Sequence, residues 1–257
     1  MRRRPALCDA GAIVRSAEIV MTLAEALAAL EAAGNPNIAT VYQRHGVAGP
    51  AYGVRLGDVD RIRRQIGTDA ALASALWGTG NHDARVLACR VADPLALSAE
   101  QLAEWVAAVD NYVLADALAG LAAKSPHRAR LGEIWRADPR EYVGRLGWRM
   151  IAQRVMAEPE VPAALLEAWL GEIQVGLAGA LNRTKEAMHD ALIAIGGTRP
   201  DVRERALAVA RAVSPVAIDH GETGCKTPDA VAYIARMAER QSSGPGQRKT
   251  GSTRHRR

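Results

Sequence analysis

Residues 98–123 read S-A-E-Q-L-A-E-W-V-A-A-V-D-N-Y-V-L-A-D-A-L-A-G-L-A-A. Apolar residues recur every three or four positions on both sides of Asp110, which predicts two helices over about 99–108 and 110–123. Ser98 with Gln101 three residues later is a capping box, the signature of a helix N-terminus. Two helices of this length joined by so short a turn favour an antiparallel pair.

The same helical pattern continues from residue 22 to about 213. Thr22 with Glu25 forms another capping box, and Asp138-Pro139 marks a further helix start. No stretch alternates β-branched and aromatic residues as a strand would. We therefore expect an all-α fold. The predicted helices are roughly 22–33, 36–45, 56–66, 69–78, 82–93, 99–108, 110–123, 128–136, 140–157, 162–177, 182–195 and 200–213.

A faint internal repeat indicates how the pairs stack. Arg85, Arg145 and Lys185 each stand one or two turns into a predicted core-facing helix, at spacings of 60 and 40 residues. This fits irregular HEAT-like repeats of about 40 residues. We therefore expect an α-solenoid with a concave face on which repeated basic residues converge.

Composition separates the body of the chain from its two ends. The 257 residues are 49% hydrophobic with three scattered cysteines, which excludes a disordered chain and a disulfide framework. The eight cations of residues 1–4 and 248–257 leave residues 5–240 with a formal charge of −3, although the whole chain carries +5. We therefore predict an N-terminal extension (1–20, with Met21 as a second candidate start), a helical domain (21–240) and a disordered basic tail (241–257).

Several classes of function are excluded by missing motifs. The sequence has no G-x-S-x-G, H-E-x-x-H or G-x-G-x-x-G, and Gly224-Cys225-Lys226-Thr227 does not complete a phosphate-binding loop. No run of about 18 apolar residues could cross a membrane. We expect a cytoplasmic, nucleoid-associated monomer with no membrane partner, no metal and no cofactor.

Asp116 is the residue most indicative of chemistry. It lies mid-helix among Leu114, Ala115 and Ala117, and on the same helix face as Tyr112. Aspartate is a poor mid-helix residue, so a cation must offset its burial, and Arg145 is the candidate. The alternative is a structural ion pair or a solvated helix edge.

Longer stretches carry a family resemblance. The runs Y-Q-R-H-G-V (42–47), L-W-G-T-G-N-H-D-A-R-V-L-A (76–88), E-W-V-A-A-V-D-N-Y-V-L-A-D (104–116) and D-H-G-E-T-G-C-K-T-P-D-A (219–230) resemble the DNA alkylation repair family, the AlkD-like glycosylases. The similarity covers about residues 22–237. It implies an α-solenoid that cradles duplex DNA and hydrolyses the N-glycosidic bond of cationic alkylpurines such as N3-alkyladenine and N7-alkylguanine.

The resemblance also implies roles for individual residues. The catalytic aspartate of the family falls on Asp116, its aromatic wall on Tyr112 and its active-site arginine on Arg145. The sequence departs from the family at Tyr112, where well-known members have tryptophan, and at Asp190, where a second DNA-facing tryptophan is expected. An acid facing a phosphate backbone would be repulsive.

Other residues are weaker DNA-binding candidates. Arg85 and Lys185 are predicted phosphate ligands, with a solvated or capping role as the alternative. Arg61, Arg63 and Arg64 form a basic cluster that could contact a flanking phosphate, although a charged outer face is the common reason for such a cluster. Trp148 shares a helix face with Arg145, and interlayer packing is its alternative role.

Three hypotheses for function follow. The first is a monofunctional DNA N-glycosylase without a lyase step, because no lysine stands at the catalytic position. The second is a relative that binds DNA structures without hydrolysis, as suggested by Tyr112 and Asp190. The third is a HEAT-type protein-interaction scaffold, as suggested by the negative charge of the body.

Overall fold

The computed structural model describes residues 21–222 and 224–242, and every regular element in these ranges is helical. The predicted extension (1–20) and the tail from residue 243 lie outside the described residues. The helices are α1 (Leu23–Ala32), α2 (Pro36–Arg44), α3 (Leu56–Ile66), α4 (Ala70–Gly78), α5 (His82–Val91), α6 (Ala99–Ala107), α7 (Tyr112–Ala122), α8 (Arg128–Arg136), α9 (Glu141–Ala157), α10 (Ala163–Gly176), α11 (Asn182–Thr198), α12 (Arg203–Val213) and α13 (Ala230–Ser242), with short 3-10 turns at Leu177–Gly179 and Pro200–Val202.

The predicted helix boundaries are close to the observed ones, with one omission. Both predicted capping boxes are present, at Thr22 and at Ser98. The unpredicted helix α13 follows Asp229, whose carboxylate accepts the N–H of Ala232 at 2.7 Å. It buries Ile234 and runs past the predicted end of the domain at residue 240.

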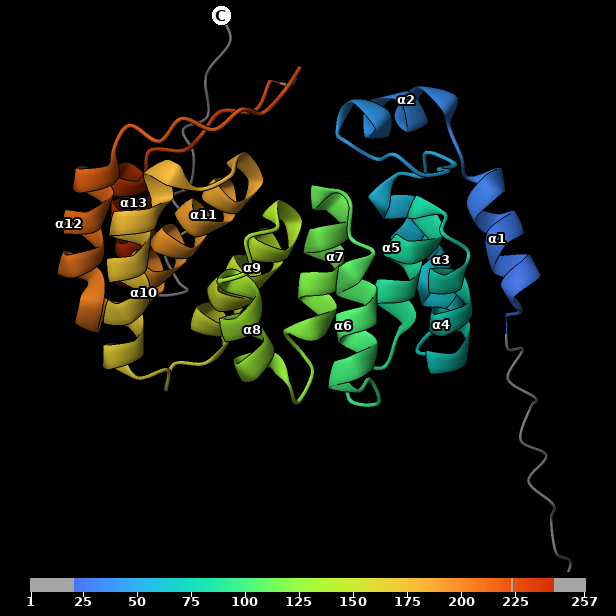
Figure 1. Cartoon of the computed structure of the whole chain (residues 1–257), viewed down its shortest axis with the longest axis horizontal. Coiled ribbons are helices and arrows are strands. Elements are labelled where there is room, and N and C mark those ends of the chain that lie inside the picture. Colours follow the sequence, from blue (N-terminus) through green and yellow to red (C-terminus); the bar gives the residue numbers. More distant parts are fainter. Residues whose placement is uncertain (1–20, 223, 243–257) are drawn as a thin grey trace, which may run out of the picture.

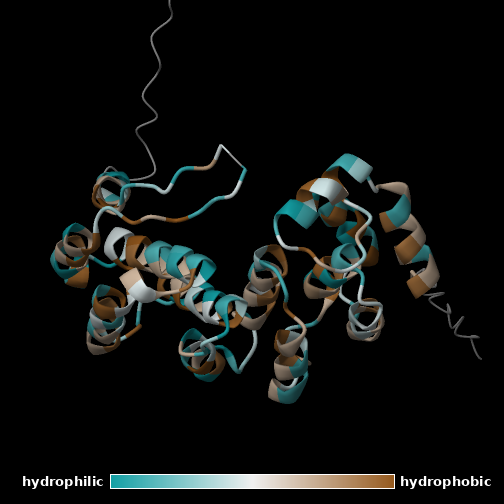
Figure 2. Ribbon diagram, turned by 45° about the horizontal axis from the view of Figure 1, so that its top comes forward, coloured by the Kyte–Doolittle hydropathy of each residue, from teal (hydrophilic) through white to brown (hydrophobic). Residues whose placement is uncertain are grey.

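The helices form two rows in chain order (Figure 1). In one row α3, α5, α7, α9, α11 and α13 each pack against the preceding member, and α4, α6, α8 and α10 pack against this row, with α12 beside α10. Figure 2 shows hydrophilic and hydrophobic residues mixed on these helices, as expected for amphipathic helices in two layers. We call the first set the inner row.

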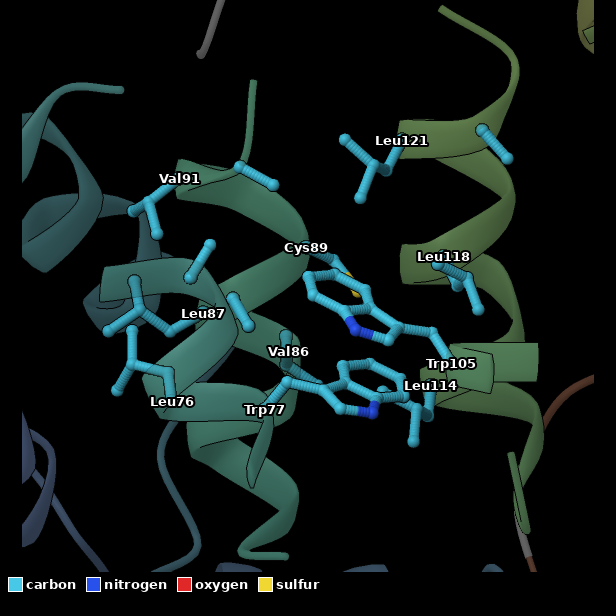
Figure 3. Packing of buried hydrophobic residues seen from close by; sticks show 14 of the residues in the cluster. Leu76, Trp77, Val86, Leu87, Cys89, Val91, Trp105, Leu114, Leu118 and Leu121 are labelled. Carbon is cyan, nitrogen blue, oxygen red and sulfur yellow. The ribbon is translucent and has the colours of Figure 1, made fainter. Parts of the chain in front are cut away.

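The core consists of two clusters that meet at α9. The N-terminal cluster includes the parallel pair Trp77 and Trp105, whose ring centroids are 4.4 Å apart (Figure 3). Leu146 and Met150 of α9 belong to this cluster, whereas Trp148 and Ile151 belong to the C-terminal one. Helix α9 therefore contributes to both cores.

Two glycines allow α9 to approach its neighbours closely. A Cβ atom at Gly147 would lie 2.0 Å from the backbone nitrogen of Arg136 on α8. A Cβ atom at Gly144 would lie 3.0 Å from the hydroxyl of Thr184 on α11. The G-R-L-G sequence of residues 144–147 thus brings the turn of α9 that carries Arg145 close to both α8 and α11.

Candidate active site

Asp116 of α7 and Arg145 of α9 form a bidentate ion pair. Arg145 Nε donates to Asp116 Oδ1 at 2.8 Å, and Nη2 donates to Oδ2 at 2.9 Å. The side chain of Arg145 is 4% exposed and that of Asp116 is 29% exposed. The predicted cation for Asp116 is therefore Arg145, and the carboxylate keeps a surface from which it can meet a ligand.

The start of α7 fixes the position of Tyr112 and Asp116. Asn111 is the N-cap, and its side-chain oxygen accepts the N–H of Leu114 at 2.9 Å. Its amide group donates to Asp110 at 2.7 Å and lies 3.4 Å from a ring nitrogen of His82. Because this cap is buried and held on several sides, the first two turns of α7 have a fixed orientation.

Charged partners extend the pair across α9 and α11. Arg145 Nη1 donates to Glu186 at 2.7 Å, and Arg183 Nη1 donates to the same carboxylate at 3.0 Å. On the other side, Arg149 lies 3.5 Å from Asp116 and donates to Asp190 at 2.7 Å. Acids and arginines alternate along this series, which we call the ion ladder. Its members are Asp190, Arg149, Asp116, Arg145, Glu186 and Arg183.

Burial and ion pairing shift the pKa values of individual ladder residues in different directions. Burial lowers the pKa of Arg145, but Asp116 and Glu186 outweigh that effect and raise it above its ordinary value. Burial raises the pKa of Glu186, yet Arg145 and Arg183 hold it below 4.5. For Asp190 burial prevails over Arg149, so the pKa of Asp190 is raised. Arg145 therefore stays cationic, and pairing shifts the pKa of Glu186 downward while burial shifts that of Asp190 upward.

Tyr112 lies against the guanidinium groups of the ladder. Its ring centroid is 4.5 Å from the Arg183 guanidinium carbon and 5.3 Å from that of Arg145. His45, which follows α2, approaches the ring edge-on at 5.6 Å. Burial raises the pKa of Tyr112 despite these cations, so the phenol is neutral near pH 7. The structure thus brings all three predicted catalytic residues together.

A cavity of about 540 Å³ opens beside Asp116 on the inner row. It is bounded by α3, α5, α7 and the middle of α9, where Gln153 lies. Its charged lining residues are Asp60, Arg63, Arg90, Asp116 and Lys124. Asp116 therefore has the ion ladder on one side and a polar cavity on the other.

The weaker DNA-binding candidates do not join this cavity. Arg85 is half-buried, with its guanidinium carbon 5.3 Å from the Trp77 ring centroid and donors within 3.5 Å of the carbonyls of Trp77 and Ala108. Lys185 is half-buried on α11. Trp148 is only 1% exposed and belongs to the C-terminal core. This burial leaves no surface for a DNA contact and fits its alternative role in packing between helix layers.

The basic cluster of α3 divides into two groups. Arg61 pairs with Asp58 of its own helix at 2.8 Å, and Arg64 donates to the carbonyl of Asp60 at 3.1 Å. Both are exposed and neither lines the cavity. Arg63, between them in the sequence, does line it. Of the three arginines predicted as a cluster, Arg63 is the one that lines the same cavity as Asp116.

Sequence reasoning also missed half of the ladder. Arg149 follows Arg145 by four positions, and Asp190 follows Glu186 by four, so each pair lies on one helix face. These matched spacings on two adjacent helices were the available signal. At Asp190, where the sequence departs from the family, the carboxylate accepts a hydrogen bond from Arg149 of the adjacent helix α9.

Within residues 21–222 and 224–242, no group of three or more His, Cys, Asp or Glu side chains is arranged to hold a metal ion. No helix in the same ranges has the length and apolar composition needed to cross a membrane.

Comparison with known proteins identifies the family. Residues 26–234 match the family described as DNA alkylation repair enzyme. The chain belongs to the DNA alkylation repair family. The uncharacterized protein Lin0241 of Listeria innocua serovar 6a is 28% identical to this chain over 217 residues, which cover 82% of this chain and 95% of the relative. The uncharacterized protein Lmo0209 of Listeria monocytogenes serovar 1/2a is 27% identical over 217 residues, with the same coverage.

A solved structure shares the fold of this family member. It is described as representing a new family of proteins related to the HEAT-like repeat DNA glycosylases with affinity for branched DNA structures. The TM-score is 0.78 at 24% identity, over 86% of this chain and 95% of that one. The all-helical, HEAT-like character of the fold is thereby confirmed.

Proposed function

We propose that this protein is a monofunctional DNA N-glycosylase that removes cationic alkylpurines from duplex DNA. The inner row would form the concave, DNA-facing side of an α-solenoid, with N3-alkyladenine and N7-alkylguanine as the substrates. The observation that carries this proposal is the bidentate Asp116–Arg145 pair, which holds a partly exposed carboxylate at the edge of a polar cavity.

The proposed chemistry requires few protein groups. An alkylated N7 or N3 purine already carries a positive charge, so it departs as a neutral base with the electron pair of the N-glycosidic bond. The sugar becomes an oxocarbenium-like cation, and water adds to C1′ and loses a proton to leave an abasic site. Asp116 stabilises the developing positive charge and orients the water, while Arg145 holds the carboxylate in place.

Tyr112 completes the site as a wall. Its ring lies on the same face of α7 as Asp116 and is fixed by the guanidinium groups of Arg145 and Arg183. A deoxyribose packed against its exposed surface would place C1′ on the side of Asp116.

The test is release of N7-methylguanine from duplex DNA that contains a single lesion, under single-turnover conditions at fixed salt. We expect the wild-type chain to release the base and Asp116→Asn to be slower by about 10²-fold or more. Asp201→Asn, at an exposed acid of a 3-10 turn, is the control and should match the wild type. Equal rates for Asp116→Asn and the wild type would refute the role of Asp116.

A second candidate function is binding of branched DNA without hydrolysis. Every acid of the ladder is paired with an arginine, so its formal charge is zero and Asp116 has no excess negative charge to offer a cation. The structural relative described above belongs to a family with affinity for branched DNA structures. Tighter binding of a four-way junction than of a linear duplex of equal length, with no base release, would favour this candidate.

A further inference from the structure

The cavity beside Asp116 has an excess of positive charge. Of its charged lining residues, Arg90 pairs with Asp60 across α5 and α3. Asp116 pairs with Arg145, which lies outside the cavity lining. Arg63 and Lys124 then remain as two cations that these acids do not neutralise. The cavity is therefore suited to a doubly charged or strongly hydrogen-bonding anion.

Arg90 supplies an unused donor at the same place. Its Nη1 group binds Asp60, but its Nε atom is buried and has no hydrogen-bond partner among the described residues. A buried guanidinium N–H without an acceptor costs free energy, and an anion in the cavity would satisfy it. Gln153 of α9 also lines the cavity and has two amide N–H donors to offer.

Helix α7 leaves its backbone open toward this space. Gly120 lines the cavity, and a Cβ atom added there would meet no other atom within 4 Å. Glycine in the middle of a helix costs roughly 0.5–1 kcal/mol relative to alanine. The open surface at this position allows a ligand to approach α7 closely, one turn beyond Asp116.

We propose that this cavity is a phosphate seat in which Arg63, Arg90 and Lys124 bind one phosphate group. This proposal rests on the proposed action on DNA, because the phosphate would belong to the DNA strand whose deoxyribose lies at Asp116. The volume of about 540 Å³ accommodates a phosphate with part of its sugar. The same chemistry could be supplied by a free phosphate ion, and the experiment separates the two sources.

The first test compares two double variants that each remove two positive charges, one inside the seat and one outside it. For wild-type protein and lesion-free duplex DNA, we measure the slope of log K against log salt concentration. Arg63→Ala with Lys124→Ala should reduce this slope by about 0.9, the amount for one phosphate, and weaken binding about 10-fold near 0.15 M salt. The control is Arg130→Ala with Arg211→Ala, which removes the same charge from two exposed arginines that do not line the cavity. Equal effects of the two double variants would refute a built seat.

The second test blocks the seat without changing charge. Gly120→Leu would project a side chain into the cavity, whereas Gly171→Leu places the same side chain on α10, where an added Cβ also meets no atom within 4 Å. We expect Gly120→Leu to lower both the DNA affinity and the salt slope, and Gly171→Leu to change neither. Thermal unfolding of both variants checks that each is folded. An unchanged DNA affinity in Gly120→Leu would overturn the proposal.

The third test identifies the source of the phosphate. Inorganic phosphate is titrated into the wild-type protein by calorimetry at constant ionic strength. Saturable binding that Gly120→Leu abolishes means that the seat also accepts the free ion. No binding of the ion, together with the DNA effects above, assigns the seat to the DNA backbone.

These outcomes are independent of base release. If the wild-type chain releases no N7-methylguanine but the seat variants lower the salt slope as expected, the seat stands and the glycosylase proposal fails. If base release occurs while the seat variants bind DNA like their controls, the glycosylase proposal stands and the seat fails.

Discussion

Two aspartates on neighbouring inner-row helices are held in opposite ways. Asp83, near the start of α5, is 1% exposed and accepts the backbone N–H groups of Tyr52, Gly53 and Val54 at 2.7, 3.0 and 3.0 Å. Asp116, on α7, is partly exposed and is held by the side chains of Arg145 and Arg149.

The difference separates a structural carboxylate from the one that we propose to be functional. Backbone amides around Asp83 fix the segment that enters α3 and leave the carboxylate no free surface. Side-chain partners around Asp116 hold it in place and leave an edge open to the cavity. Burial of an aspartate therefore says little about its role until its partners are known.

The largest expected effect tests this contrast with one chemical change at both sites. Asp83→Asn turns an amide N–H group toward buried backbone N–H groups, and we expect the free energy of unfolding to fall by about 3 kcal/mol. Asp116→Asn can turn its amide toward solvent and should lose about 1 kcal/mol. Urea unfolding of the two variants measures both values. A larger loss at Asp116 would reverse our assignment of the structural and functional carboxylates.

The next effect sharpens the role of guanidinium geometry. Arg145→Lys keeps the charge but cannot bind Asp116 through two parallel hydrogen bonds, so we expect base release to slow by about 10-fold or more. Arg149→Lys, at a half-exposed position 3.5 Å from Asp116, should slow it by less than about 3-fold. Single-turnover rates of the two variants provide the measurement. Similar rates would mean that charge alone positions Asp116.

A pH dependence is expected from Glu186. Its folded-state pKa lies below 4.5, so its pairing with Arg145 and Arg183 stabilises the fold above that pH and is lost as the pH falls through the folded pKa. Glu186→Gln should therefore reduce the free energy of unfolding by about 1–2 kcal/mol at pH 7. The difference from wild type should vanish at the acid end of a series of denaturant titrations. A constant difference across that series would contradict the linkage.

The smallest effect concerns Asp190. Asp190→Asn removes a negative charge from the inner row and releases Arg149 from its pair, so duplex DNA should bind a few-fold more tightly. Fluorescence anisotropy at fixed salt detects this change, with Asp201→Asn as the matched surface control. Weaker binding would show that Asp190 positions Arg149 for DNA.

The helices and the central pair were predictable for physical reasons. Caps such as Ser98 with Gln101 are local signals that the surrounding fold did not override. A carboxylate at Asp116 needs a cationic partner, because burying an unpaired charge costs too much free energy. Arg145, in a later helix of the predicted repeat, is that partner. Helix α13 was missed although its sequence is amphipathic. It begins at Ala230, well beyond the end of α12 at Val213, so it does not continue the pattern of closely spaced helices.

The remaining parts of the site depend on tertiary approach. Arg61, Arg63 and Arg64 are chemically alike, and only the rotation of α3 against α5 decides which one reaches the cavity. The choice of Glu186 as a partner for Arg145 depends on the close approach of α9 and α11 at Gly144. Such relations join residues far apart in the chain and leave no local pattern.

The sharing of α9 between the two cores has a consequence for cooperativity. Neither half of the molecule keeps a complete core without this helix, so the two halves should unfold together rather than as separate units. Arg145 of this shared helix also binds Asp116 of α7 and Glu186 of α11, so a change in the spacing of these three helices would alter the hold of Arg145 on Asp116.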